Sequence, residues 1–300
     1  MPIDHVLKLY SESIRSPYLH YGFWDDPESI DPNELTLDDM VKAQGRYIEH
    51  LASFIPEKVK TILDVGAGIG GNSSYLISKG YEVEALSPDE YQETVFKEKY
   101  DGQVKFYRSK FENFEPEKKY DLVFESESAC YIEIEPGWET AQKTVRDGGY
   151  LLASDYFLYH NDGSGDWHIK ASHDEKNYIK KAEEYGFKLI KEFDQTENTM
   201  PTLDGAKALM ERFIFPTLEF SSNYLGKNHP FILKVIKKAF GKKVDDKIKQ
   251  LSLLDSKDFK KYKRYMIYYF RKLINHDRKQ NHDCKKAKDS YSIWRRIQIC

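Results

Sequence analysis

Short apolar runs alternate along the chain with longer segments in which apolar positions recur every three or four residues. The runs are typical of buried strands, and the longer segments are typical of amphipathic helices. The pattern predicts strands at 61–65, 82–86, 104–107, 120–124, 150–154, 187–193 and 265–270. It predicts helices at 5–16, 36–54, 72–79 and 174–185. This alternation indicates an α/β protein with a parallel, doubly wound sheet.

The strand expected at 61–65 runs directly into a glycine-rich turn at 66–71. Glycine is needed there because only a backbone without Cβ bends so sharply and lets a ligand lie against it. The turn also reads as GxGxxG, the dinucleotide fingerprint. Asp64, however, places a carboxylate at the carboxyl end of the strand, where it opposes a pyrophosphate. A ligand with a cationic amine, such as S-adenosylmethionine, suits this position better.

The segment Leu63–Gly71 resembles the cofactor motif of the class I S-adenosylmethionine-dependent methyltransferases. Within them, the chain is similar to the small-molecule branch of tocopherol, sterol, sarcosine/dimethylglycine and natural-product methyltransferases, and more distantly to cyclopropane fatty acid synthases. The resemblance implies a Rossmann-like, doubly wound, seven-stranded sheet with a helical lid inserted between strands six and seven. It divides the chain into an N-terminal helical cap segment (1–55), an S-adenosylmethionine-binding core (56–202), a helical substrate lid (203–262), a last core strand (263–274) and a basic tail (275–300).

The resemblance also implies which residues contact the cofactor. The glycine turn would present its backbone to the methionine part, and Asp64 would order that turn and reach the amine directly or through water. Ser87 follows the second strand, where relatives usually carry an acid for the ribose, so it would share that role with Gln92 or merely cap the next helix. The expected cofactor residues are Asp64, Gly66, Ala67, Gly68, Ser87, Gln44, Tyr21, Trp24, Ser109, Phe111 and Glu125.

The same resemblance implies that two further segments lie at the active site. Residues 18–24 match an aromatic family segment that folds over the cofactor, although an aromatic cluster is also typical of plain core. The segment that includes the end of the fourth strand resembles the tocopherol-type sequence, and Glu127 stands at the position of the glutamate in that sequence. Glu125 and Glu127 are two residues apart, which suggests that both project near the transferred methyl group, unless they are solvated loop carboxylates. Glu127 is the first candidate for a general base and His20 the second, and Tyr131, Tyr156 and His160 are expected to line the substrate pocket.

Composition limits the class of protein further. No apolar run approaches the roughly 18 residues that a membrane span needs, and the first residues lack the pattern of a signal peptide. The three cysteines, Cys130, Cys284 and Cys300, show neither metal-ligand spacing nor a disulfide framework. The sequence therefore predicts a cytoplasmic protein without a metal site.

Charge is distributed unevenly, although the net charge is only −3. Residues 1–226 hold 24 Lys and Arg against 42 Asp and Glu, and residues 227–300 hold 22 against 7. The basic quarter could contact an anionic membrane surface, or it could neutralise the acidic body. The second interpretation is favoured.

These observations predict an S-adenosylmethionine-dependent methyltransferase that acts on a small hydrophobic or aromatic acceptor, such as a lipid, isoprenoid, quinone or natural product. Alternatives within the class are N-methylation of a small amine and a cyclopropanating reaction that begins with alkene methylation. An NAD-dependent oxidoreductase is disfavoured by Asp64. A nucleic-acid methyltransferase is disfavoured by the acidic body and the lack of a recognisable module. The chain could also bind the cofactor without transferring its methyl group, and it is expected to be a monomer or a homodimer.

Overall fold

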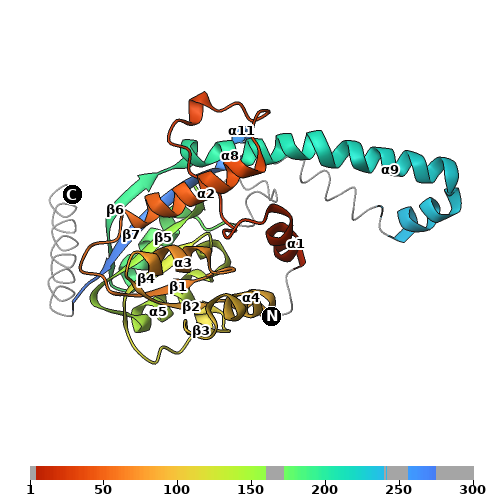
Figure 1. Ribbon diagram of the computed structural model, residues 1–300. Helices are drawn as coiled ribbons and strands as arrows, with labels where there is room; N and C mark the ends of the chain where they lie inside the picture. The colour runs from red at the N-terminus through yellow and green to blue at the C-terminus, as the bar shows by residue number, and fades with distance from the viewer. Residues whose placement is uncertain (1–4, 160–171, 240, 242–255, 275–300) are drawn as a thin grey trace, which may run out of the picture.

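A mixed sheet forms the centre of the molecule in the computed structural model, which describes residues 5–159, 172–239, 241 and 256–274 (Figure 1). Its seven strands lie in the order β3-β2-β1-β4-β5-β7-β6. They span Phe106–Tyr107 (β3), Glu82–Leu86 (β2), Thr61–Val65 (β1), Tyr120–Ser126 (β4), Val145–Leu158 (β5), Lys263–Lys272 (β7) and Phe187–Asp194 (β6). The first five of these strands pair in parallel, whereas β7 runs antiparallel to both of its neighbours. The predicted doubly wound, seven-stranded sheet is confirmed.

Helices cover both faces of this sheet. One face packs on α2 and α8 through a core that includes Tyr47, Leu51 and Leu203, and the other packs on α5 and α7 through Trp138 and Tyr178. The helices are α1 (His5–Ile14), α2 (Leu37–Ala52), α3 (Gly71–Ser78), α4 (Glu90–Tyr100), α5 (Ile134–Thr144), α7 (Glu175–Glu184), α8 (Thr196–Leu209), α9 (Phe215–Asn228) and α11 (Ser256–Tyr262). Short 3₁₀ turns lie at Pro27–Ser29, Phe111–Asn113 and Ala129–Tyr131, and a π-helical turn, η4, at Met210–Ile214.

The predicted element boundaries hold where local chemistry defines them. Thr36 caps α2 by accepting from the backbone N–H of Asp39, whose side chain accepts from Thr36 in return, so this end follows directly from the sequence. The strand predicted at 150–154 is longer than expected, since β5 begins at Val145 and includes residues 146–149. The pairing of β4 with β5 shifts register there, between Tyr120 and Leu122. This irregularity lets the strand continue through the glycines, as a β-bulge does.

The order of the strands determines where a ligand can bind. The chain passes from β1 to β2 and β3 on one side of β1, and then crosses back to β4 on the other side. In open α/β sheets, the crevice at such a reversal lies beyond the carboxyl ends of the strands, and ligands bind there. The loops after β1, β2 and β4 therefore form the region in which a site is expected.

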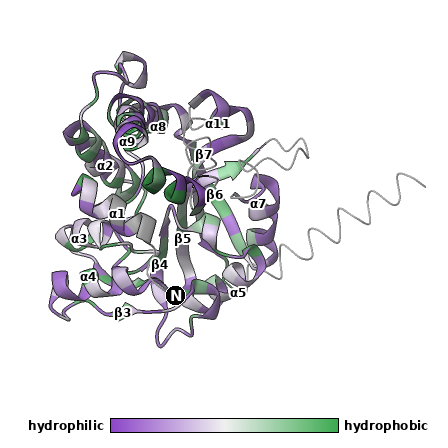
Figure 2. Ribbon diagram, turned by 90° about the vertical axis from the view of Figure 1, so that its right-hand side faces the viewer, coloured by the Kyte–Doolittle hydropathy of each residue, from purple (hydrophilic) through white to green (hydrophobic). Residues whose placement is uncertain are grey.

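A helical insert connects β6 to β7, as predicted for the lid. It begins with α8 at Thr196, directly after β6, and continues through η4 into α9. Figure 1 shows α9 extending away from the sheet. Figure 2 shows hydrophobic positions on these insert helices beside hydrophilic ones.

Candidate active site

A cavity of about 530 Å³ lies at the carboxyl ends of β1, β2 and β4, where the strand order reverses. Its walls come from residues 17–20, 65–69, 71–72, 86–89, 92, 110–112, 126–128 and 131–132. The cap segment thus contributes one wall, and the loops after the strands contribute the others. No described residue of the insert between β6 and β7 lines the cavity.

The turn after β1 is shaped by left-handed glycines. Gly66, Gly68 and Gly70 have φ values of 73°, 57° and 82°, which side chains other than glycine rarely adopt. The backbone N–H groups of Gly66 and Ala67 donate to the carbonyl of Leu86, at 2.8 and 3.2 Å, and so fix the turn to β2. Helix α3 begins immediately afterwards, and its first turn faces the cavity with unpaired backbone N–H groups.

Asp64 lies behind this turn and does not line the cavity. Its carboxylate is buried and accepts a 2.6 Å hydrogen bond from the Ser73 hydroxyl on α3. Burial raises the pKa of Asp64 to about 6, and the bond from Ser73 opposes that rise. Asp64 therefore joins β1 to α3, and the predicted direct contact with a ligand is not supported.

The loop after β2 brings three polar side chains to the cavity: Ser87, Asp89 and Gln92. The Ser87 hydroxyl donates to the side-chain oxygen of Gln92 at 2.6 Å. Asp89 caps α4 by accepting from the backbone N–H of Gln92 at 2.9 Å. The interpretation of Ser87 as the helix cap is therefore wrong, and sequence reasoning missed Asp89, which supplies an acid two residues later.

Glu127 lines the cavity where β4 ends. Its Oε1 accepts hydrogen bonds from the backbone N–H of Tyr21 at 2.6 Å and from the hydroxyl of Tyr265 at 2.5 Å. Its own N–H donates to the carbonyl of Ser154 at 2.8 Å. Burial raises the pKa of Glu127 to about 8, although its two donors oppose that rise. A carboxyl group with such a pKa exchanges its proton near neutral pH, as a general base or acid requires.

Glu125 points to the other side of the sheet. It lies in a separate small cavity with Trp138, and the hydroxyl of Tyr178 donates to its Oε2 at 3.3 Å. The prediction that Glu125 and Glu127 share one side is wrong, and so is the predicted cofactor contact of Glu125. The reason is that strand alternation ends at Ser126, and Glu127 adopts a left-handed φ of 51° that turns the chain.

His20 lines the cavity but has both ring nitrogens engaged. Nδ1 lies 2.7 Å from the carbonyl oxygen of Tyr21, and Nε2 lies 2.9 Å from Oδ1 of Asn72. Burial lowers the pKa of His20 to about 4, so the ring is neutral at pH 7. A neutral ring donates from only one nitrogen, so Asn72 either accepts from Nε2 through its Oδ1 or, with its amide turned by 180°, donates to it. His20 has no free lone pair for a substrate proton, and the geometry does not support a role as base.

Other expected cofactor residues attach the cap segment to the core. The side chain of Gln44 donates to the carbonyl of His20 at 2.6 Å and accepts from Ser16 at 2.5 Å. The indole N–H of Trp24 donates to Thr202 on α8 at 3.0 Å. Gln44, Tyr21 and Trp24 do not line the cavity, so the predicted direct contacts of these side chains are not supported. The segment does fold over the site, but its cavity wall is residues 17–20.

The remaining predicted residues are divided between the cavity and its surroundings. Phe111 is a buried part of the wall, and Tyr131 lies at its exposed edge, with 79% of its surface accessible. Ser109 does not line the cavity, and neither does Tyr156, whose hydroxyl accepts a 3.7 Å contact from the Cys130 thiol. His160 lies outside the described residues.

A doubly wound sheet with a glycine turn at its switch point defines a Rossmann-like ligand-binding protein. Residues 41–192, just over half of the chain, match a protein family described as the methyltransferase domain. The chain therefore belongs to this methyltransferase family, and the predicted family is confirmed.

Two curated plant proteins resemble part of the chain. Over 75 residues it is 37% identical to the chloroplastic tocopherol O-methyltransferase of Arabidopsis thaliana. Over 74 residues it is 39% identical to the corresponding protein of rice, Oryza sativa subsp. japonica, whose name is qualified as probable. Each match covers 23% of this chain and spans about a fifth of the plant protein, 21% and 19% respectively.

Solved structures match over nearly the whole chain. The [4+2]-cyclase SpnF has a TM-score of 0.62 at 14% identity, with 91% of this chain and 97% of that one covered. Geranyl diphosphate C-methyltransferase from Streptomyces coelicolor, in complex with Mg²⁺, geranyl diphosphate and S-adenosyl-L-homocysteine, has a TM-score of 0.63 at 13% identity, with 88% and 92% covered. At such identities the likeness shows the fold alone.

The raised pKa values of Glu125 and Glu127 predict how these two groups affect stability as the pH changes. Each has a pKa of about 8 instead of 4.5, and burial is the main cause. The two groups bind extra protons in the folded state between these values, so their contribution to stability is greatest below about pH 4.5 and falls as the pH rises toward 8. Glu125→Gln and Glu127→Gln should each reduce the loss of unfolding free energy between pH 5 and pH 8. Urea denaturation at both pH values measures this loss, and an unchanged loss in both variants would contradict the assignment.

Proposed function

We propose that this chain is an S-adenosylmethionine-dependent methyltransferase that acts on a small, hydrophobic or aromatic acceptor. The observation that carries the proposal is the cavity at the switch point of a methyltransferase-family fold, formed by the glycine turn and covered by the cap segment. Its volume of about 530 Å³ lies within the usual range of small-molecule sites.

The residues present fit the parts of S-adenosylmethionine. The backbone of the glycine turn and the first turn of α3 offer N–H groups to its carboxylate, since a helix N-terminus favours negative charge. Ser87, Asp89 and Gln92 supply donors and acceptors for the ribose hydroxyls. Asp89 caps α4, but a carboxylate has about four acceptor sites, so it retains capacity. Phe111 offers an apolar wall for the adenine.

S-adenosylmethionine would supply a methyl group on a sulfonium, which is already electrophilic. The residues of this chain then have to hold the acceptor in line and exclude water. Residues 17–20 cover the cavity, and Leu19, Tyr131 and Ile132 give its wall an apolar part. Glu127 lines the same space, where it orients an acceptor, takes its proton or stabilises positive charge on it.

Carbon, oxygen and nitrogen acceptors are all compatible with this arrangement. An isoprenoid or phenolic acceptor is favoured because the wall is partly apolar and because the plant proteins that match part of this chain are named for tocopherol. We also place the protein in the cytoplasm, which agrees with three cysteines that show no disulfide framework.

Cofactor identity is tested by calorimetry with S-adenosylhomocysteine and with NAD. Asp89→Asn keeps a residue that caps helices well but removes the charge. We therefore expect it to weaken S-adenosylhomocysteine binding by about 1.5–3 kcal/mol without lowering the melting temperature. Asp174→Asn is the matched control, because Asp174 caps α7 in the same way and does not line the cavity. Binding of NAD without any response to S-adenosylhomocysteine would refute the proposal.

The role of Glu127 is tested separately. In Glu127→Gln the amide oxygen can still accept from Tyr21 and Tyr265, so the cap segment should stay in place and cofactor binding should persist. Methyl transfer to an acceptor found by screening isoprenoids, quinones and phenols should fall by about 10²–10⁴-fold, the usual contribution of general acid–base catalysis. Glu125→Gln controls for loss of a buried carboxyl group on the opposite side. Unchanged turnover in Glu127→Gln would remove this residue from the catalytic machinery.

A further inference from the structure

The insert between β6 and β7 carries an exposed helical arm, defined here as residues 210–239. It consists of η4, α9 and a following helical stretch, 230–239. Figure 1 shows α9 extending beyond the sheet and its covering helices. Nine of the fifteen large hydrophobic side chains that are exposed in the described residues belong to the arm. Phe220 and Phe231 are 70% and 77% exposed. Such a concentration of exposed apolar groups marks an interaction surface.

Three exposed aromatic side chains of η4 and α9 lie in one row. Phe213, Phe220 and Tyr224 are seven and four residues apart, which places them in one row. The rings of Phe220 and Tyr224 stack with their centroids 6.2 Å apart. Arg212 and Glu219 each precede a member of this row by one residue, and the Arg212 guanidinium lies over the Phe213 ring, 5.2 Å from its centroid. This part of the arm therefore presents a row of aromatic side chains to solvent.

The stretch 230–239 repeats the arrangement with a stronger charge. Phe231, Ile232, Val235 and Ile236 recur at helical spacing and are all exposed. Leu233 turns toward α9. Its Cδ2 lies 3.4 Å from the position that a Cβ on Gly226 would occupy. Lys234 and Lys237 fall away from this apolar row, and Lys238, seven residues after Phe231, borders it.

Charge distinguishes the arm from the body of the protein. From residue 227 to 239 there are four lysines and no acid, whereas residues 1–226 have a net charge of −18. All four lysines are exposed, and none forms an ion pair within the part of the chain that the structure describes. Other basic residues of the C-terminal quarter do pair with the body, such as Lys260 with Glu197 and Arg264 with Glu175. The favoured interpretation, neutralisation of the body, thus fits the residues around β7 but not the arm.

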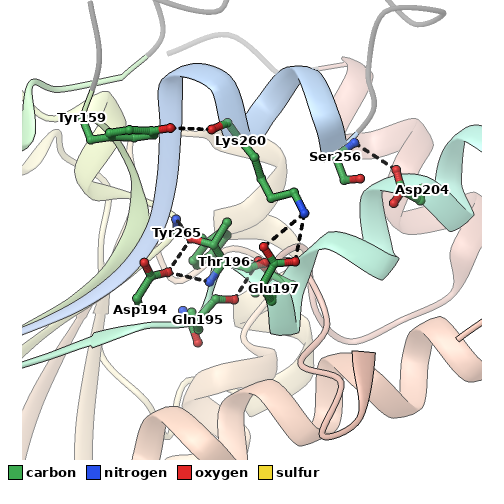
Figure 3. Close-up of polar contacts among 10 residues, drawn as sticks. Tyr159, Asp194, Gln195, Thr196, Glu197, Asp204, Ser256, Lys260 and Tyr265 are labelled. Carbon is green, nitrogen blue, oxygen red and sulfur yellow. Dashed lines mark hydrogen bonds and ion pairs between the residues drawn. The ribbon is translucent and has the colours of Figure 1, made fainter. Parts of the chain in front are cut away.

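The base of the arm is fixed to the sheet. Figure 3 shows Lys260 of α11 reaching Glu197 of α8, at 3.1 and 2.9 Å, and Ser256 donating to Asp204 at 2.9 Å. The hydroxyl of Thr196 accepts from the backbone N–H of Tyr265, also at 2.9 Å. A surface that binds the arm would consequently hold the whole catalytic body in a defined orientation.

We propose that the arm docks on an anionic membrane surface, with its apolar side at the boundary of headgroups and acyl chains and its lysines on lipid phosphates. Segments that bind at the interface of an anionic membrane are usually basic, amphipathic helices that are not apolar enough to span the bilayer. Within the described residues, no helix has the length and apolarity of a membrane span. A second copy of the chain is a poorer occupant, because two arms with the same excess of lysines repel each other. The acidic body avoids anionic lipid, so among the described residues the arm is the part that approaches. Docking does not depend on the proposed reaction.

The test is co-sedimentation of the full chain with vesicles of phosphatidylcholine alone and of phosphatidylcholine with phosphatidylserine. We expect binding to the anionic vesicles only, and a large loss between 0.1 and 1 M salt, as the Debye length falls from about 10 to about 3 Å. Phe220→Ser with Phe231→Ser should lower binding by at least about tenfold. Lys234→Gln with Lys237→Gln and Lys238→Gln should lower it by about a hundredfold.

Two controls keep the outcome decisive. Ile190→Ser removes a side chain of β6 that is 45% exposed and lies outside the arm, and it should leave vesicle binding unchanged. Sedimentation velocity without lipid tests the alternative occupant, a second copy of the chain, because it measures whether the protein dimerises. The proposal is overturned if the wild type binds no vesicles, if binding survives the arm variants, or if those variants convert a dimer to a monomer. Calorimetry with S-adenosylhomocysteine is independent of all these readouts, so failure of docking and failure of the proposed function are distinguishable.

Discussion

One carboxylate oxygen, Oε1 of Glu127, joins three parts of the chain that are distant in sequence. It accepts from the backbone N–H of Tyr21 and the hydroxyl of Tyr265, while the residue itself directly follows β4. The contact helps to hold residues 17–20, which form the N-terminal wall of the cavity, against the core. Burial of a carboxyl group is costly and raises its pKa to about 8, and the two donors offset part of that cost. The candidate catalytic group is thus also the group that fixes the wall of its own cavity.

Close packing at the start of α3 completes this wall. A Cβ on Gly71 would lie only 2.1 Å from the carbonyl oxygen of Pro17, so the cap segment can cross the helix only over a glycine. His20 and Asn72 then connect the two elements by a hydrogen bond. The second part of the glycine motif therefore serves the approach of the protein's own backbone, and its first part serves the turn at the cavity. A dinucleotide fingerprint read from sequence alone does not separate these two roles.

The fold could be predicted because its signals are local. Apolar strands, the glycine turn and the Thr36 cap lie in continuous sequence, and the family motif placed the cavity at the correct strand ends. Side-chain direction could not be predicted, because it depends on single backbone angles and on distant partners. The left-handed φ of Glu127 separates it from Glu125, and Trp24 turns away from the cavity to meet Thr202, 178 residues later. Asp89 could not be assigned from the motif, because it lies two residues beyond Ser87, which occupies the position where relatives carry the acid.

The central claim is that S-adenosylmethionine binds in the cavity beneath the cap segment. Hydrogen–deuterium exchange, measured with and without S-adenosylhomocysteine, tests it most directly, because bound ligand should slow the opening of the walls that contact it. We predict slower exchange in residues 17–22, in the glycine turn at 66–72 and after β2 at 87–92, with no change on α5 and α7 across the sheet. Binding that leaves these three segments unchanged, or that protects only the opposite face, would contradict the account.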